Sequence, residues 1–471
     1  MVQGVVIEDG CIVDVNPSTG ETIAKVRVDT PETVAAAIAA AHAAQPAWAA
    51  TPLAERIAKL KAVCAVLLAD KDAMAALITQ EMGKVHAEAV EEADGLAKDD
   101  YMDLIAAANA PQQLENGLVV REAHGVVGVC SPWNFPCDEP LLLSLPALAA
   151  GNTVVLKPSE VVPLVGAKVA AALMAGLPEG VVQLVQGDGV VGAALVGGDV
   201  QMIGMTGSTA TGKKIMEAAS KDLKRLVLEL GGKDPMVVFA DADLAKAAED
   251  AVGNSLYNCG QVCCSVERVY VEASVLPAFE EACAKLATDF AAGDGMAEAS
   301  KIGPLVSSLQ KEHVAAQVDA AVAAGAKIVA QGAVPGGSAG NFYPATVLST
   351  PLDSTIHKSE TFGPIVALSS FDGSEGEAIK LANDTEYGLA AYVYSQDLDK
   401  ATRVAMGIKA GQVGINNWSL ACAPASCPWI GQKSSGYGYH SGADGWRQFS
   451  VPKSLIFSTK EDLGTQHKAA E

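Results

Sequence analysis

The sequence has few aromatic side chains and few positive charges for its length. Aromatic residues make up only 5% of the 471 residues although half of the chain is hydrophobic, so small aliphatic side chains must fill the interior. Such an interior is typical of closely packed α/β layers. The 33 basic residues are outnumbered by 55 acidic ones, which gives a net charge of −22. A surface this acidic repels phosphate and anionic lipid, so we expect binding to neither nucleic acid nor membranes.

Long apolar runs and paired cysteine motifs are also missing. The best candidate for a membrane span, Leu141–Leu156, is interrupted by Pro146 and Gly151. Met1–Gly10 contains no Lys or Arg and no long apolar region, so it does not resemble a signal peptide and we expect a cytoplasmic location. None of the ten cysteines forms a C-x-x-C pair. This predicts no metal site and favours free thiols over disulfides.

Short apolar runs alternate with helical stretches along most of the chain. Helix starts are expected at Thr30-Pro31 and again at Thr51-Pro52, where Thr would cap and Pro would occupy the first helical position. Leu53–Met82 has helical period throughout. Further helices are expected at Val165–Met174 and Gly212–Ala219. The predicted strands fall into two series: Val126–Cys130, Thr153–Leu156, Val181–Val185 and Met202–Met205; then Met236–Phe239, Arg268–Val271, Ile365–Ser369 and Val413–Ile415. Two such series predict two parallel-sheet α/β domains with a cleft between them.

Three segments carry residues suited to acyl chemistry. Asn258–Cys264 places Cys263 shortly after a glycine turn, although a single cysteine is more often a small buried hydrophobe. Leu228–Lys233 places Glu229 before two glycines, where it is either a general base or an ordinary strand-edge carboxylate. Ser131–Pro136 contains Asn134, which can donate a neutral N–H to an oxyanion or simply form part of a rigid turn.

Three further segments suit a dinucleotide. Gly207–Lys214 follows a strand and opens a helix, so its backbone N–H groups suit a phosphate. It nearly matches the P-loop of nucleotide triphosphatases, but Lys214 stands where the Ser or Thr for magnesium is needed. Lys157–Glu160 follows a strand, at the edge where α/β folds bind cofactors. Glu360–Pro364 combines a carboxylate with an aromatic ring, which suits a ribose and a flat base.

Together, in this order and spacing, the six segments resemble the aldehyde dehydrogenase superfamily from about Thr30 to Leu455. The resemblance implies that Cys263 is the nucleophile, Glu229 the general base, and Asn134, with the Cys263 N–H, the oxyanion hole. It implies NAD as cofactor. The residues implied to bind it are Lys157 and Glu160 at the adenosine ribose, Gly207 and Ser208 at the pyrophosphate, Glu360 and Phe362 at the nicotinamide, with Trp133, Ser159 and Leu230 beside them. Glu160 would repel a 2′-phosphate, which favours NAD over NADP.

The same resemblance implies the architecture. Residues 1–104 and 124–231 would form a cofactor domain and 232–431 a catalytic domain. Residues 105–123 and 449–459 would form small segments that join subunits into a homodimer or homotetramer. The presence of Glu229 favours hydrolysis of the acyl enzyme over its transfer to coenzyme A or phosphate. The presence of Cys263, Glu229 and Asn134 argues against a catalytically silent relative.

Some positions depart from the family pattern and bear on the substrate. Trp429-Ile430 stands where an aromatic-Gly pair is usual, and Tyr439 stands where Arg is common. Glu139 follows the Asn134 motif, where many relatives are apolar. It either faces the substrate tunnel and favours an amino- or betaine-type aldehyde, or is a helix-start acid near the dipole. Tyr257, Trp418 and Trp429 would add cation–π contacts, and Asn416 matches a position beside the tunnel.

Overall fold

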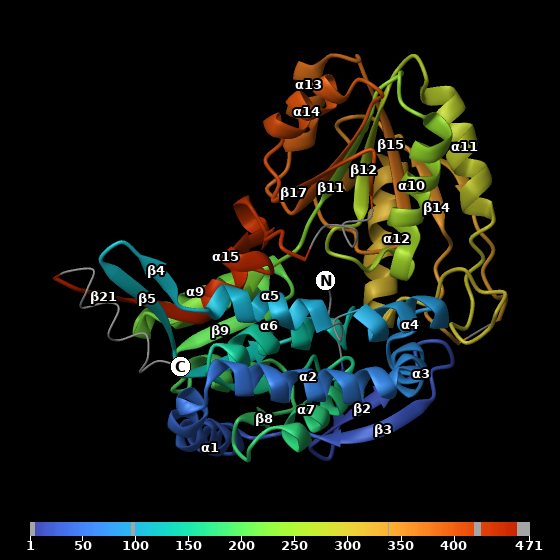
Figure 1. Ribbon diagram of the computed structural model, residues 1–471. Coiled ribbons are helices and arrows are strands. Elements are labelled where there is room, and N and C mark those ends of the chain that lie inside the picture. The colour runs from blue at the N-terminus through green and yellow to red at the C-terminus, as the bar shows by residue number, and fades with distance from the viewer. Residues whose placement is uncertain (1–4, 96–98, 338, 419–424, 459–471) are drawn as a thin grey trace.

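Two mostly parallel sheets, each with one antiparallel edge strand and with helices covering both faces, make up most of the chain (Figure 1). The computed structural model describes residues 5–95, 99–337, 339–418 and 425–458. No helix within those ranges is both long and apolar enough to cross a membrane.

The first sheet has six strands in the order β19-β10-β9-β6-β7-β8, and only β19 runs antiparallel to its neighbour. The strands are β6 (Val126–Cys130), β7 (Thr153–Lys157), β8 (Val182–Leu184), β9 (Met202–Thr206), β10 (Arg225–Glu229) and β19 (Gly436–Tyr437). Alternate residues face opposite ways. Val126 and Ile203 pack against α1 (Pro31–Ala50), α8 (Gly189–Gly197) and α9 (Thr209–Ala219), while Val127 and Val129 pack against α2 (Leu53–Ala69), α6 (Asp138–Ala149) and α7 (Pro163–Gly176).

The second sheet has seven strands in the order β13-β14-β15-β12-β11-β16-β17. They are β11 (Asp234–Val238), β12 (Val266–Glu272), β13 (Lys327–Gln331), β14 (Thr346–Ser349), β15 (Ile365–Phe371), β16 (Ala390–Tyr394) and β17 (Gln412–Ile415). One face packs against α10 (Leu244–Leu256), α11 (Leu276–Thr288) and α12 (Ser308–Ala323), and the other against α13 (Glu375–Asn383) and α14 (Leu398–Gly407). The chain passes from the first sheet to the second through residues 230–233, between β10 and β11.

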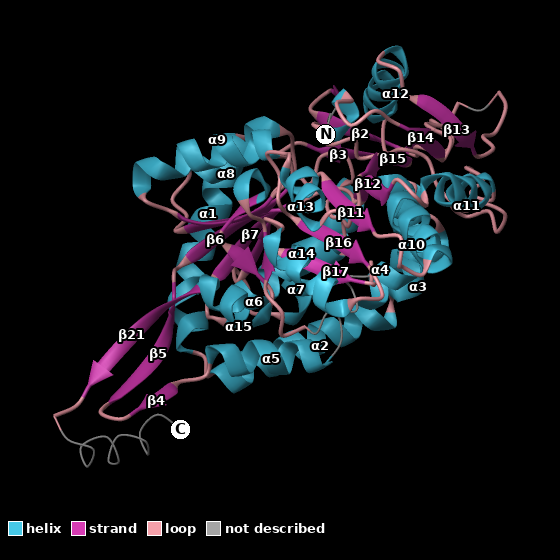
Figure 2. Cartoon of the chain, turned by 90° about the horizontal axis from the view of Figure 1, so that it is seen from above, coloured by secondary structure: helices cyan, strands magenta, loops and turns pink. Residues whose placement is uncertain are grey.

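Smaller elements surround the two sheets. A three-stranded sheet of β4 (Gln112–Leu114), β5 (Gly117–Ala123) and β21 (Ser450–Ile456) projects as an arm (Figure 2). The other elements are β1 (Val6–Glu8), β2 (Cys11–Val15), β3 (Thr22–Arg27), α3 (Lys71–Met82), α4 (His86–Gly95), α5 (Asp99–Asn109), β18 (Trp429–Ile430), β20 (Tyr439–His440) and α15 (Gly442–Trp446).

The predicted helices and strands are present, but not all of their boundaries were predicted correctly. α1 begins at Pro31 with Thr30 as its cap, as predicted. The second start was wrong in detail, because Pro52 caps α2 without a side-chain bond while the Thr51 hydroxyl closes α1 by donating to Ala47 O at 3.0 Å. The single helical period over Leu53–Met82 is interrupted at Asp70, which ends α2 and begins α3.

Candidate active site

The Cys263 loop is held in an unusual backbone conformation at the end of α10. Asn258, Cys259 and Gly260 have φ values of 50°, 55° and 70°, a left-handed region that residues other than glycine rarely adopt. The Asn258 N–H donates to the Glu88 carboxylate at 2.9 Å, which fixes the loop from α4. A Cβ on Gly260 would lie 2.1 Å from the Gly363 carbonyl oxygen, so only glycine allows this approach. The turn delivers the half-buried thiol of Cys263 to the space between the two sheets.

Glu229 ends β10 directly beside this loop. Its side chain is only 3% exposed. The Trp429 indole N–H donates to Oε1 at 3.3 Å, and Oε2 has no hydrogen-bond partner within the described ranges. A Cβ on Gly232 would lie 2.3 Å from the carbonyl oxygen of Cys263, so the two chain segments touch through their backbones. Glu229 and the nucleophile candidate, which are 34 positions apart in the sequence numbering, therefore meet in one site.

Burial and neighbouring groups raise the pKa values of both residues. The pKa of Glu229 lies well above its ordinary value, first because of burial and next because of the Glu139 carboxyl. The pKa of Cys263 is also raised well above its usual value, by its hydrogen bond with the Cys264 thiol, by burial and by Glu229. The environment therefore favours the protonated form of both groups, as expected where acid–base chemistry is tuned by burial and neighbouring charges.

Asn134 reaches the same loop from the first sheet. Its side-chain Nδ2 donates to the Gln261 backbone carbonyl at 3.1 Å, and its backbone carbonyl accepts a hydrogen bond from Asn258 Nδ2 at 3.0 Å. The amide is 5% exposed. Since an Asn amide carries two N–H donors, one remains for a ligand after the bond to Gln261. The three predicted catalytic residues are thus brought together.

The predicted substrate residues gather carboxyl and aromatic groups. Glu139, in the first turn of α6, accepts a bond from the Thr206 hydroxyl at 2.8 Å, and burial raises its pKa to about 7. Tyr257 donates its hydroxyl to Glu91 at 3.1 Å, and its ring lies 6.4 Å from that of Trp418. The pKa of Tyr257 is raised by burial and then by Glu88 and Glu91, so several carboxyl groups face this ring.

Asn416 and Leu230 also make structural contacts, and their predicted roles in binding substrate and cofactor stay predictions. The Asn416 amide accepts from the Ser395 N–H at 3.0 Å and donates to the Ser395 carbonyl at 2.9 Å, which occupies it in joining β17 to β16. The backbone N–H of Leu230 donates to Ser435 O at 2.9 Å, and its side chain packs against Gly212.

A cavity of about 300 Å³ opens at the carboxyl ends of the first sheet's strands. The predicted cofactor residues among its lining are Trp133, Lys157, Ser159, Glu160, Gly207 and Ser208. Lys157 Nζ donates to the Glu160 carboxylate at 3.1 Å, so the pair offers a ligand both a hydrogen-bond donor and a hydrogen-bond acceptor. Ser131, which also lines the cavity, has a buried hydroxyl without a partner among the described residues. The size, the two glycine-lined walls at Gly192 and Gly207 and this donor set fit the adenosine half of a dinucleotide.

Some residues of this cavity were not predicted as ligands. Lys214 and Thr211 line it from α9. The signal was present in the Gly207–Lys214 segment, but comparison with the P-loop treated Lys214 only as a failed magnesium position. In this structure Lys214 lines the cavity from α9, so it can offer a positive charge to a phosphate bound there. Within the described ranges, no group of three or more His, Cys, Asp or Glu residues is arranged to hold a metal.

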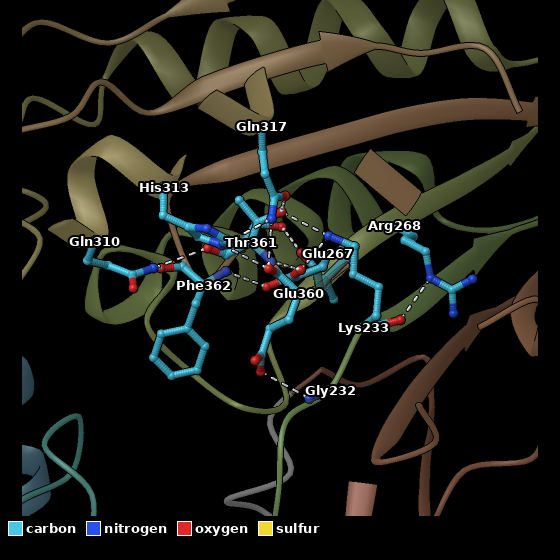
Figure 3. Close-up of polar contacts among 12 residues, drawn as sticks. Gly232, Lys233, Glu267, Arg268, Gln310, His313, Gln317, Glu360, Thr361 and Phe362 are labelled. Carbon is cyan, nitrogen blue, oxygen red and sulfur yellow. Dashed lines mark hydrogen bonds and ion pairs between the residues drawn. The ribbon is translucent and has the colours of Figure 1, made fainter. Parts of the chain in front are cut away.

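The remaining cofactor candidates, Glu360 and Phe362, lie on a separate segment from the second sheet (Figure 3). The Gly232 N–H donates to Glu360 Oε1 at 3.1 Å, and burial raises the pKa of Glu360 to about 7. The Phe362 ring packs edge-on against Trp133 with ring centres 5.4 Å apart. Because Trp133 also lines the cavity, its contact with Phe362 joins the two groups of cofactor candidates.

Comparison with known proteins places this geometry in context. The model of the aldehyde dehydrogenase family matches residues 7–455. A glutarate-semialdehyde dehydrogenase of Pseudomonas putida is 38% identical over 458 residues, covering 94% of this chain and 93% of that protein. A betaine aldehyde dehydrogenase of Sinorhizobium fredii is 36% identical and is covered, like this chain, over 96% of its length. The crystal structure of a Staphylococcus aureus betaine aldehyde dehydrogenase in complex with NAD+ is 32% identical, with a TM-score of 0.89, and the match covers 95% of this chain and 91% of that one.

Proposed function

The chain belongs to the aldehyde dehydrogenase family, and from that membership we propose that it oxidises a cationic aldehyde to its carboxylate with NAD. The observation that carries the substrate class is the Glu139 carboxyl, which interacts with both Cys263 and Glu229. Trp429 bonds Glu229, and the Tyr257 and Trp418 rings lie together beside the Glu91 carboxylate. The catalytic roles below are proposed for the residues whose contacts support them.

The reaction begins with the Cys263 thiolate adding to the aldehyde carbon. The carbonyl oxygen becomes an oxyanion, which accepts N–H bonds from the Asn134 amide and the Cys263 backbone. NAD, when bound, supplies the hydride acceptor for the hydrogen on that carbon. Loss of the hydride leaves a thioester on Cys263. Glu229 then takes a proton from water, the hydroxide adds to the thioester carbon, and the carboxylic acid leaves as the thiolate is restored.

Cys263 and Glu229 must each be deprotonated at a defined point of this cycle. The raised pKa of Cys263 means that its thiol must lose a proton before attack, and Glu229 lies close enough to interact with that thiol. Glu229 in turn must be ionised before it can accept a proton from water. Both requirements favour turnover at higher pH, because each active form is the deprotonated one.

The cavity residues are suited to NAD in preference to NADP. In the proposed complex, Lys157 and Glu160 hold the adenosine ribose hydroxyls, and Gly207, Ser208 and Lys214 lie at the phosphates. A carboxylate at the ribose accepts hydroxyl bonds but repels a 2′-phosphate. The Staphylococcus aureus relative with bound NAD+ supports the same choice.

The substrate class follows from the carboxyl groups that face the nucleophile. Glu139 adds to the raised pKa values of both Cys263 and Glu229, so its carboxyl lies near the reacting atoms. Its hydrogen-bond partner is the neutral Thr206 hydroxyl, and no Lys or Arg pairs with it in the described part of the chain. A substrate cation would supply the missing counterion and stack on the neighbouring rings. An anionic semialdehyde would meet repulsion at the same place.

A matched set of aldehydes tests this proposal. Betaine aldehyde and 3,3-dimethylbutanal have the same shape and differ in the charge of one atom, and glutarate semialdehyde supplies the opposite sign. We expect kcat/KM for NADH formation to favour betaine aldehyde over the neutral isostere by about 5- to 30-fold, the range of one cation–π contact or close charge pair. Glu139→Gln should shrink that ratio, whereas Glu312→Gln, on the exposed side of α12, should leave it unchanged. Equal values for the cation and its isostere would remove the substrate class but leave aldehyde oxidation standing.

The division of the chain into units is part of the same proposal. We infer that residues 1–104 and 124–231 bind the cofactor, that 232–431 carry the nucleophile, and that the arm of β4, β5 and β21 joins copies of the chain. The arm presents Leu455 and Ile456 at 39% and 86% exposure, which favours burial against another subunit. A measured mass equal to the 48.2 kDa of one chain would contradict the subunit contact.

A further inference from the structure

A buried ion pair links the nucleophile loop, the general-base segment and the cofactor segment. Lys233 Nζ lies 2.5 Å from Glu267 Oε2, and the two side chains are 0% and 5% exposed. Lys233 stands four residues after Glu229 on the way into β11, and Glu267 stands four residues after Cys263 at the start of β12. None of the catalytic or binding roles proposed above uses either residue.

The Glu267 carboxylate is also the partner of the cofactor segment's backbone. Thr361 N–H donates to Oε2 and Phe362 N–H donates to Oε1, each at 2.8 Å (Figure 3). Lys233 Nζ completes the contact by donating to the Thr361 hydroxyl at 2.9 Å. One carboxylate thus accepts two adjacent backbone N–H groups and one ammonium group, which fixes its position strongly.

The carbonyl groups of the same segment are held from α12. Gln317 Nε2 donates to Glu360 O at 2.9 Å, and its Oε1 accepts from the Thr361 hydroxyl at 2.8 Å. Gln310 Nε2 donates to the carbonyls of Thr361 and Phe362 at 3.2 and 3.0 Å. The backbone of these three residues is therefore held largely by buried or half-buried side chains rather than by a neighbouring strand.

The conformation held in this way is not one that the segment would adopt unaided. Phe362 has a φ of 54°, in the left-handed region that is unfavourable for a bulky residue. That conformation sends the Phe362 ring toward Trp133 while Glu360 turns to the Gly232 N–H. Loss of the two N–H bonds to Glu267 leaves the Thr361 and Phe362 N–H groups without their acceptor and favours relaxation of the segment toward an ordinary φ, against the remaining bonds from α12.

We propose that Glu267, fixed by Lys233, is a positioning residue that holds Glu360 and Phe362 in the geometry that grips the nicotinamide half of the cofactor. This inference rests on the proposed role of Glu360 and Phe362 in binding NAD. Glu267 touches neither the cofactor cavity nor the reacting groups, so its effect passes through the backbone of the segment. The adenosine half, held by Lys157 and Glu160 on the other sheet, is independent of it.

The two halves of the cofactor give a direct test. Dissociation constants of NAD and of AMP are measured by titration calorimetry on the full-length protein and on Glu267→Gln, which keeps the shape but turns an NH2 group toward Lys233 or the backbone N–H groups. We expect NAD binding to weaken at least tenfold while AMP binding changes less than twofold, and KM for NAD to rise more than kcat falls. Glu272→Gln, at the other end of β12, should change neither ligand.

Loss of both affinities in equal measure, or of neither, would overturn the proposal. If Glu267→Gln does not fold, Gln317→Met decides, because it removes the bonds to Glu360 and Thr361 without leaving a charge unpaired. The expected result is again selective loss of NAD, and equal loss of NAD and AMP, or loss of neither, would again overturn it. Glu360→Gln separates this inference from the proposed function. If Glu360→Gln weakens NAD and Glu267→Gln does not, the positioning role alone is wrong. If Glu360→Gln leaves NAD unchanged, the cofactor role of the segment is wrong, and the positioning role falls with it.

Discussion

The backbone contact between Gly260 and Gly363 makes one added methyl group a severe test of the site. A Cβ at position 260 would lie 2.1 Å from the Gly363 carbonyl oxygen and 2.3 Å from its carbon. The nucleophile loop and the cofactor segment would have to separate by roughly 1 Å to restore normal contact. Gly260→Ala therefore increases the distance between the Cys263 loop and the cofactor segment without removing any functional group.

The magnitude follows from two terms. Gly260 has a φ of 70°, and alanine there costs about 1–2 kcal/mol. Relieving the overlap against backbone, which cannot rotate away as a side chain can, costs about 1–3 kcal/mol more. A displacement near 1 Å between reacting groups lowers the rate by about 100-fold. We therefore expect a melting temperature lower by several degrees and kcat/KM lower by about two orders of magnitude.

Gly253→Ala is the matched control. Gly253 lies within α10, seven positions before Gly260, and a Cβ there would have nothing within 4 Å. Alanine in a helix interior is favoured over glycine by about 1 kcal/mol. Differential scanning fluorimetry and NADH absorbance should show this variant to be at least as stable and as active as the parent. Parental stability and rate in Gly260→Ala would refute the close approach of the two loops.

Three further outcomes follow from the site. Cys263→Ala should reduce NADH formation by at least about 10⁴-fold, and a residual rate near the parent's would remove Cys263 as nucleophile. Because the protonated forms of Cys263 and Glu229 are inactive and their pKa values are raised, kcat/KM should increase with pH above neutrality. Cys264→Ala removes the hydrogen bond that contributes most to the raised pKa of Cys263, so it should move that increase to lower pH. A series of kcat/KM measurements from pH 6 to pH 10 would detect both effects. Glu160→Gln should reduce the preference for NAD over NADP by about fivefold, the value of one charge removed near a phosphate in solvent, and an unchanged ratio of kcat/KM values would show that Glu160 does not select the cofactor.

The sequence predicts those parts of the fold that rest on local pattern. Val126–Cys130 is a strand with the predicted bounds, because its apolar run is buried on both faces and ends at a motif that cannot continue it. The interruption at Asp70 was not predicted, because the apolar period continues across it and only tertiary packing separates α2 from α3. Regular period identifies an element more reliably than it identifies where that element ends.

The candidate site shows the same division. Cys263, Glu229 and Asn134 each stand in a motif with turn residues, and the structure brings the three together. Glu267 carries no such signal. It precedes an apolar run and reads as an exposed strand end, yet it is buried against Lys233, which is 34 residues away. A buried charge pair is visible only when both partners are placed in space, since each residue alone is more often solvated.

The position of β19 has a consequence for how the chain is made. β10, which ends at Glu229, gains its outer neighbour only from Gly436-Tyr437, and Trp429, which bonds Glu229, is separated from it by 200 residues. During synthesis the outer edge of β10 therefore stays unpaired until the whole second sheet, which ends with β17 at Ile415, has been translated. Open edges of this kind invite pairing with other chains and slow folding through long-range closure. β19, which is translated after all seven strands of the second sheet, thus covers the outer edge of the strand bearing the proposed base, and a chain that stops before Gly436 would leave that edge unpaired.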